Sequence, residues 1–117
     1  MISLPRHFPT VVHMLQEAAA EAGDAEALVA GDERLSYAEY LSCVAGFARE
    51  LQTRVAAGER VAMLMGNSTD ICIALFATHA AGAVAVPLNP LYTERELRPV
   101  LADARPTVLI HDDAVAP

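Results

Sequence analysis

Polar segments that follow apolar runs contain the residues with the clearest potential for chemistry. Residues 66–70 read GNSTD and follow the apolar run 60–65. A turn between a buried strand and a helix is where open α/β sheets bind ligands, and helix N-terminal N–H groups attract anions. The segment has one glycine instead of GxGxxG, so a helix cap explains it better. Asn67 or Ser68 is then the capping residue, and Asp70 complements the helix dipole.

A second segment that follows an apolar run lies at residues 87–92, which read PLNPLY. Two prolines and an asparagine predict a rigid departure from the preceding strand. A rigid exit at a strand end can form one wall of a ligand site, or it can be a plain connector, and spacing alone favours the connector. The residues that would form such a wall are Asn89, Pro90 and Leu91.

No set of nucleophile, base and orienting group can be drawn from this sequence, so no catalytic residue is predicted. His79, near the end of an apolar helical pattern, is expected to be a hydrogen-bonded core or interface residue. His7, His13 and His111 lack the spacing of metal ligands, so no metal site is expected. The adjacent carboxylates Asp112 and Asp113 are interpreted as solvated charge.

Cys43 and Cys72 lie within separate apolar helical patterns and lack the CxxC spacing of metal or redox sites. We expect both to be buried thiols. All 8 basic residues are arginine and the net charge is −7. The charge makes nucleic acid an improbable partner, and the absence of lysine excludes a Walker-type phosphate loop and a lysine nucleophile.

The N-terminus, MISLPRHFP, has no apolar region typical of a secretion signal. No stretch of about 18 apolar residues is free of charge and proline, so no membrane-spanning segment is expected. These two features predict a cytoplasmic protein.

The elements that must position these segments follow from hydrophobic periodicity. Thr10 can cap an amphipathic helix that stops at Gly23. Residues 27–30 and 34–37 flank Gly31-Asp32 and predict a small hairpin. Residues 36–39 match a capping box, so a long helix is expected from there to Gly58. Its inward stripe is Tyr40, Leu41, Val44, Ala48, Leu51 and Val55.

After Gly58 the pattern changes to compact apolar runs at 60–65, 83–87 and 107–110, which predict buried strands. Between them lie the helical patterns 70–81 and 93–104, the second opened by a Thr-x-x-Glu box. Pro99 should kink that second helix or delay its start. The fold class predicted is α/β: a partial three-layer sheet with a parallel βαβαβ core, preceded by an N-terminal helix and a small hairpin.

The predicted fold looks incomplete at its C-terminal end. A doubly wound sheet would continue with another helix after the strand at 107–110, whereas only residues 111–117 follow. We therefore expect one segment, 1–117, of a larger domain whose remainder is absent here.

Three motifs in order resemble those of adenylate-forming enzymes, the AMP-dependent synthetase/ligase superfamily. Residues 35–40, LSYAEY, resemble the pattern L-[ST]-Y-x-E-L, and residues 59–68, ERVAMLMGNS, resemble G-D-R-V-A-[IL]-x-x-x-N-[ST]. Residues 80–90, AAGAVAVPLNP, resemble A-G-A-[VA]-x-V-P-[IL]-[ND]-P. The sequence looks most like an acyl-CoA synthetase, because peptide-synthetase adenylation domains usually have Asp where Asn89 stands.

The resemblance implies a ligase that uses ATP and Mg²⁺ to form an acyl adenylate from a carboxylic acid. A thiol, commonly that of coenzyme A, then displaces AMP. The family's catalytic motifs and lysines are absent here, so the 117 residues alone are not expected to bind these cofactors or to be active. In the family, the turn matching Asn89, Pro90 and Leu91 lies near the coenzyme A entrance. Some relatives have arginine where this sequence has Leu91.

Two other interpretations stay open. The parent protein could be an adenylation domain that loads a carrier protein, in which case a carrier domain would follow downstream. Alternatively, the chain is a stand-alone, non-catalytic α/β binding module. In that case its exposed sheet edge should be covered by a partner, for example by self-association. Otherwise the expected partner is the remainder of the same enzyme.

Overall fold

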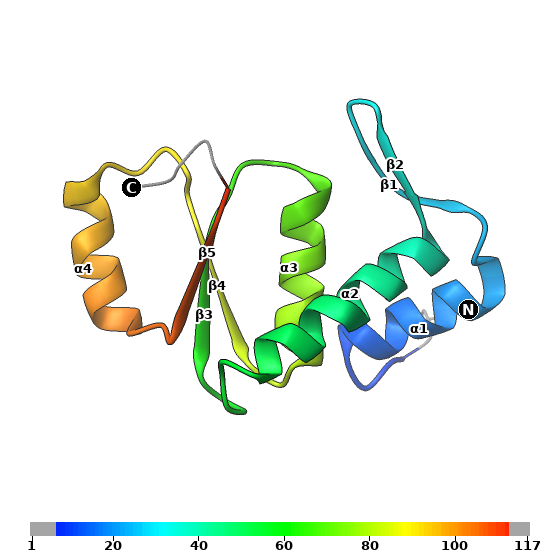
Figure 1. Ribbon diagram of the computed structural model, residues 1–117, viewed down its shortest axis with the longest axis horizontal. Coiled ribbons are helices and arrows are strands. Elements are labelled where there is room, and N and C mark those ends of the chain that lie inside the picture. Colours follow the sequence, from blue (N-terminus) through cyan, green and yellow to red (C-terminus); the bar gives the residue numbers. More distant parts are fainter. Residues whose placement is uncertain (1–6, 113–117) are drawn as a thin grey trace, which may run out of the picture.

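The computed structural model describes residues 7–112. Helices and strands follow one another in the order that the sequence predicts, with boundaries that differ by one residue or a few (Figure 1). The elements are α1 (Val11–Ala22), β1 (Glu26–Ala30), β2 (Glu33–Ser36), α2 (Tyr37–Gln52), β3 (Arg60–Leu64), α3 (Thr69–Ala80), β4 (Val84–Leu88), α4 (Glu94–Ala104) and β5 (Val108–His111).

Side-chain caps fix where the helices begin. The Thr10 hydroxyl accepts a hydrogen bond from the His13 N–H at 3.2 Å and starts α1. At α2, Ser36 Oγ accepts from the Glu39 N–H at 3.1 Å, and Glu39 Oε1 accepts from the Ser36 N–H at 2.9 Å. The backbone bond from Ser36, more than the side-chain bond, lowers the pKa of Glu39. Both halves of the predicted capping box are therefore present.

The prediction that α2 runs to Gly58 is wrong, because the helix ends at Gln52. The Thr53 hydroxyl donates to the Glu50 carbonyl at 2.7 Å, and the Arg54 N–H donates to the Leu51 carbonyl at 2.9 Å. These bonds satisfy carbonyls that a longer helix would use. Val55 is still buried, but it reaches the core from the loop, which is why the apolar stripe extended past the helix.

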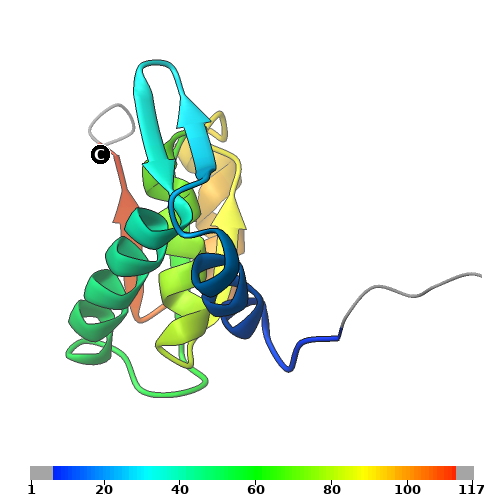
Figure 2. The same cartoon turned by 90° about the vertical axis from the view of Figure 1, so that its right-hand side faces the viewer.

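A parallel sheet with the strand order β4-β3-β5 forms the centre of the fold. Helix α4 lies on one side of this sheet, and α3, α2 and α1 lie on the other (Figure 1). The β1-β2 hairpin is antiparallel and extends past the end of the helical layer (Figure 2). The predicted fold class is confirmed: α/β, with a partial three-layer arrangement around a parallel βαβαβ core.

Strand β3 sends alternate side chains into two separate apolar clusters, as the period of a strand requires. Val61 and Met63 pack in the larger cluster with α2 and α3, which includes Val44 and Leu51. The smaller cluster faces α4, and its buried members are Ala62, Leu64 and Leu88. Burial of side chains such as Leu51 contributes roughly 1.5–3 kcal/mol each. Most of this stabilisation lies on the α3 side of the sheet.

Pro99 does not delay the start of α4. Thr93 caps the helix, with both bonds of a capping box to Glu96, and α4 continues through Pro99 to Ala104. The capping box, six residues before the proline, therefore decides the start. Within residues 7–112, no helix combines the length and the apolar character needed to cross a membrane.

Candidate functional site

The carboxyl ends of the three parallel strands meet at one edge of the sheet. Leu64 at the end of β3 lies opposite Leu88 in β4 and His111 in β5. The segments that follow these residues are the turn at 66–70, the turn at 87–92 and the chain after β5. This edge is where open α/β sheets bind ligands, so we treat it as the candidate site.

The turn after β3 is mainly a helix cap. Ser68 Oγ accepts the Ile71 N–H at 3.3 Å, which identifies Ser68, and not Asn67, as the N-cap of α3. The next residue, Thr69, is buried and donates its hydroxyl to Glu33 Oε2 at 2.8 Å. That bond ties the hairpin to the start of α3. The prediction that this segment caps a helix is confirmed.

The prediction that Asp112 is a solvated charge is wrong. Its side chain is half-buried, and its Oδ2 accepts a hydrogen bond from the Gly66 N–H at 3.0 Å. Asp113 lies outside the described residues. The two bonded residues are 46 positions apart, and no local pattern signals such a pairing. This contact joins the turn after β3 to the end of β5.

The turn after β4 is rigid, as predicted. Asn89 Oδ1 accepts the Leu91 N–H at 2.9 Å, and the Asn89 carbonyl accepts the Tyr92 N–H at 3.1 Å. Pro90 occupies the second position of this turn, where its fixed φ is favourable. Leu91 is 86% exposed at the tip of the turn. Asn89, Pro90 and Leu91 therefore present a fixed and partly apolar surface at the candidate edge.

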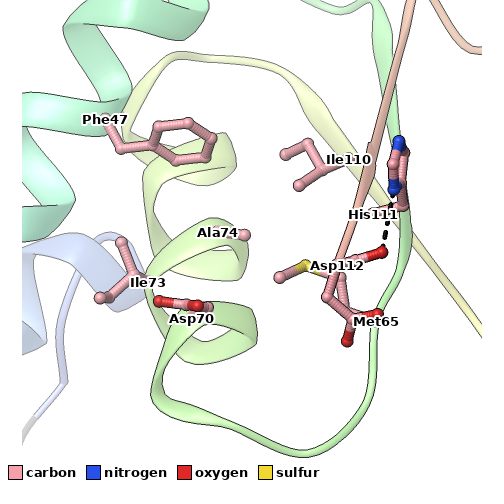
Figure 3. A pocket seen from close by; sticks show the side chains of 8 residues that line it. All are labelled: Phe47, Met65, Asp70, Ile73, Ala74, Ile110, His111 and Asp112. Atoms are coloured by element: carbon pink, nitrogen blue, oxygen red, sulfur yellow. Dashed lines mark hydrogen bonds between the residues drawn. The ribbon is translucent and has the colours of Figure 1, made fainter. Parts of the chain in front are cut away.

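A pocket of about 240 Å³ lies beside this edge, between β5 and the helices on the α3 side (Figure 3). Phe47 from α2 and Ile73 from α3 form one wall, and Met65 and Ile110 from the sheet segments form the other. Asp70, His111 and Asp112 are the polar residues of its lining. The sequence analysis did not predict this pocket, because its walls come from segments far apart along the chain.

The expectation that Cys43 and Cys72 are both buried is wrong. Cys43 is exposed and Cys72 is only partly buried. Cys43 directly precedes Val44 of the inward stripe and so lies on the outer surface of α2. His79 was expected in the core or at an interface. It is exposed at the end of α3, at the opposite end of the sheet from the candidate site, so it is not a core residue, and the interface alternative stays a prediction.

The candidate edge does not offer the groups that ATP and Mg²⁺ need. In the part of the chain that the structure describes, no three His, Cys, Asp or Glu side chains gather closely enough to hold a metal ion. The sequence contains no lysine, and the exposed tip of the Asn89 turn is Leu91 instead of a basic residue. The described residues can form a wall or a scaffold, but they do not fit a phosphate-binding or metal-binding role.

The family model described as "AMP-binding enzyme" matches residues 15–117 of this chain. One of the linear gramicidin synthase proteins of Brevibacillus parabrevis is 38% identical over 102 residues, which are 86% of this chain and 1% of that protein. The long-chain-fatty-acid–CoA ligase of Yersinia pestis is 32% identical over 108 residues, which are 91% of this chain and 19% of that protein. The chain therefore spans at most about a fifth of the length of these relatives.

Solved structures of the same fold agree with the sequence comparison. The inhibitor-bound N-terminal domain of FACL13 from Mycobacterium tuberculosis matches with a TM-score of 0.87 and 32% identity, over 92% of this chain and 28% of that chain. The N-terminal subdomain of NpsA from Klebsiella oxytoca, in complex with anthranilyl-AMSN, matches with a TM-score of 0.82 and 29% identity. That match covers 87% of this chain and 27% of the NpsA chain.

Proposed function

Because the chain belongs to the AMP-binding enzyme family, we propose that it is the N-terminal segment, residues 1–117, of an ATP-dependent carboxylate–CoA ligase. The observation that carries the CoA assignment is the similarity to long-chain-fatty-acid–CoA ligases over 91% of this chain. The PLNP sequence of the rigid exit at residues 87–90 supports the same assignment. We propose a carboxylic acid as the substrate and the cytoplasm as the compartment.

The part played by these 117 residues is that of a scaffold and a binding wall. The turn of Asn89, Pro90 and Leu91 is held by two hydrogen bonds to Asn89, one accepted by its side chain and one by its backbone carbonyl. The turn is therefore already ordered, and presenting its surface to a ligand costs little conformational entropy. Leu91 offers an apolar contact that suits the uncharged arm of coenzyme A better than its phosphates. We propose this turn as part of the coenzyme A entrance.

The reaction itself is assigned to the remainder of the protein. Formation of an acyl adenylate needs positioned cations around the developing negative charge. The chain has no lysine, and its described part has no metal-ligand cluster, so ATP and Mg²⁺ are expected to bind mainly elsewhere.

The first test uses the product of the whole gene. Its intact mass is compared with the 12.4 kDa of this chain, and ATP–pyrophosphate exchange is then measured with a panel of carboxylic acids. We expect a longer product that exchanges pyrophosphate with at least one acid and forms its CoA thioester. A longer product that activates no acid in the panel would contradict the ligase proposal. The 117-residue chain should show no exchange.

The proposed wall has a test of its own in the same assay. Leu91→Asp should raise the KM for coenzyme A severalfold and leave the pyrophosphate exchange unchanged, because only the second step meets this turn. Val11→Asp is the matched control, since Val11 is also an exposed apolar residue but lies on α1. Equal effects of the two variants would exclude a specific role for the turn.

A carrier-protein adenylation domain is the second candidate. The similarity to gramicidin synthase and to the NpsA subdomain favours it. The two candidates differ in the thiol that accepts the acyl group. Transfer to a carrier protein encoded downstream, with no CoA thioester formed, would decide for this alternative.

A further inference from the structure

The turn after β4 and the first half of α4 are held by hydrogen bonds of their own. Asn89 accepts two N–H groups of the turn, and Thr93 and Glu96 form the capping box that starts α4. Within residues 7–112, no hydrogen bond or ion pair joins residues 89–98 to a part of the chain outside the turn and α4. The segment is therefore ordered internally, but no polar contact ties it to the sheet.

The opposite end of α4 is anchored to the start of β3. Arg60 Nη1 donates to the Ala104 carbonyl at 3.0 Å, where its positive charge also complements the helix dipole. Just after the helix, the Thr107 N–H donates to the Arg60 carbonyl at 2.8 Å, and the Thr107 hydroxyl donates to Glu59 Oε2 at 3.0 Å. These long-range hydrogen bonds fix the C-terminal end of α4, so the two ends of the helix are held very differently.

Between its ends, α4 meets the sheet through apolar side chains. Leu97, Val100 and Leu101 pack on the smaller cluster, and each of them stays partly exposed. No residue of α4 is buried, and residues 91–96 are all exposed. Among the described elements, α4 lies alone on its side of the sheet (Figure 1). Apolar contacts are non-directional, so a helix held in this way can shift on the sheet at little cost.

We propose that residues 89–104, the turn together with α4, form a gate at the coenzyme A entrance. The gate pivots at its anchored C-terminal end, and Arg60 is the positioning residue that holds this pivot. When the gate closes, the turn moves as one unit and brings Leu91 against the uncharged arm of coenzyme A. This inference rests on the proposed function, because it takes the Asn89 turn as part of that entrance.

A ligand closes a gate only if it binds the closed state better than the open state. Leu91 is 86% exposed, so covering it against an apolar part of the ligand supplies a contact that only the closed state has. The turn keeps its internal hydrogen bonds in both states, and closing therefore orders few additional groups. The 11 residues of α4 span about 16 Å, so a rotation of about 10° at Ala104 moves the turn by about 3 Å.

Residue-resolved amide hydrogen exchange on the whole gene product, without and with saturating coenzyme A, tests the gate. Without the ligand, the amides of α4 should exchange at least about tenfold faster than those of α3. Coenzyme A should slow the α4 amides at least about tenfold and leave those of α3 unchanged. Exchange of α4 that is already as slow as that of α3 would show that another part of the protein holds the helix, and would overturn the proposal. Exchange of α4 that bound coenzyme A leaves unchanged would overturn it as well.

Variants of Arg60 in the whole gene product test the pivot. Arg60→Met keeps an unbranched stem but has no donor for the Ala104 carbonyl. It should raise the KM for coenzyme A severalfold and speed the exchange of α4, while pyrophosphate exchange stays unchanged. Arg60→Lys can still donate to this carbonyl and should keep the KM near that of the parent. Arg54→Met is the matched control, because Arg54 is an exposed arginine that bonds Glu50 of α2. Equal losses in both reaction steps would indicate general destabilisation and contradict the proposal.

Calorimetric titration of the same protein with coenzyme A separates failure of the gate from failure of the proposed function. If coenzyme A does not bind, the assignment as a CoA ligase is refuted, and the gate with it. If coenzyme A binds while the exchange of α4 and the KM of Arg60→Met stay those of the parent without ligand, the gate alone is refuted. Binding that slows the exchange of α4, and that Arg60→Met weakens, supports both.

Discussion

Glu59 connects the two segments that enter β3 and β5. Its Oε1 accepts the Ala56 N–H at 2.5 Å, and its Oε2 accepts the Thr107 hydroxyl at 3.0 Å. The backbone bond from Ala56, followed by the bond from Thr107, lowers the pKa of this carboxyl group. A single exposed side chain thus positions the N-terminal ends of two strands, at the opposite end of the sheet from the candidate site.

Glu59→Gln should make stability less dependent on pH. Because the folded pKa is depressed, the ionised carboxylate stabilises the fold above the ordinary glutamate pKa of about 4.3, and the gain disappears as the pH falls through the folded value. Urea unfolding should therefore show the variant less stable than the parent at about pH 7, and nearly equal to it once the pH is below the folded value. Glu50→Gln, on the exposed surface of α2, is the control. A difference between parent and variant that is constant with pH would contradict this account.

Helix α4 is held at its ends more than along its length. Thr93 and Glu96 form a capping box at its start, and Arg60 Nη1 donates to the Ala104 carbonyl at 3.0 Å at its end. Arg105, with φ of 48°, terminates the helix in the left-handed region. None of its residues is buried. The helix therefore depends on local signals to an extent that α2 and α3 do not.

Pro99→Ala should stabilise α4. Proline has no N–H to bond the Arg95 carbonyl and disfavours helix interiors, but it also restricts the unfolded chain, so the net gain should be about 1–2 kcal/mol. Urea unfolding measures this gain. Pro106→Ala is the matched control, because Pro106 lies outside the helix and should give no gain. A loss of stability in Pro99→Ala would show that the proline fits α4 without strain.

The whole molecule is packed unevenly about its sheet. The α3 side contains the larger cluster, in which Val44, Leu51 and Ala77 are buried. Tyr40 adds a polar anchor there, because its hydroxyl donates to the Cys72 carbonyl at 2.8 Å, and burial raises the pKa of this tyrosine. The α4 side has a much smaller cluster. Local opening should therefore begin at α4.

Hydrogen exchange on the 117-residue chain should reveal this order. The amides of α4 should exchange at a lower opening free energy than those of α3, because α4 buries no residue and α3 buries four. The measurement compares the two helices within one sample, so the global stability of the chain cancels. Equal protection of α3 and α4 would indicate that the chain opens as a single cooperative unit.

Sequence alone determined the features that depend on neighbours within one or two helical turns. The caps Thr10, Ser36 and Thr93 were predicted correctly, because a capping bond spans only three residues. The rigid turn at Asn89 was predicted for the same reason, since its amide side chain bonds the backbone two residues on. Its role as a coenzyme A wall came from resemblance and stays a prediction.

Only the tertiary structure decided the features that join distant segments. The strand order β4-β3-β5 brings Asp112 next to Gly66 and places Pro87 in an edge strand. It also makes β5 the other edge strand of the sheet among residues 7–112. The pocket between α2, α3 and β5 likewise needs side chains from across the chain. Hydrophobic periodicity fixes which face of an element is buried, but it does not specify which element covers that face. Packing of the whole chain makes that choice, because the contacts that stabilise it exist only when all the layers are in place.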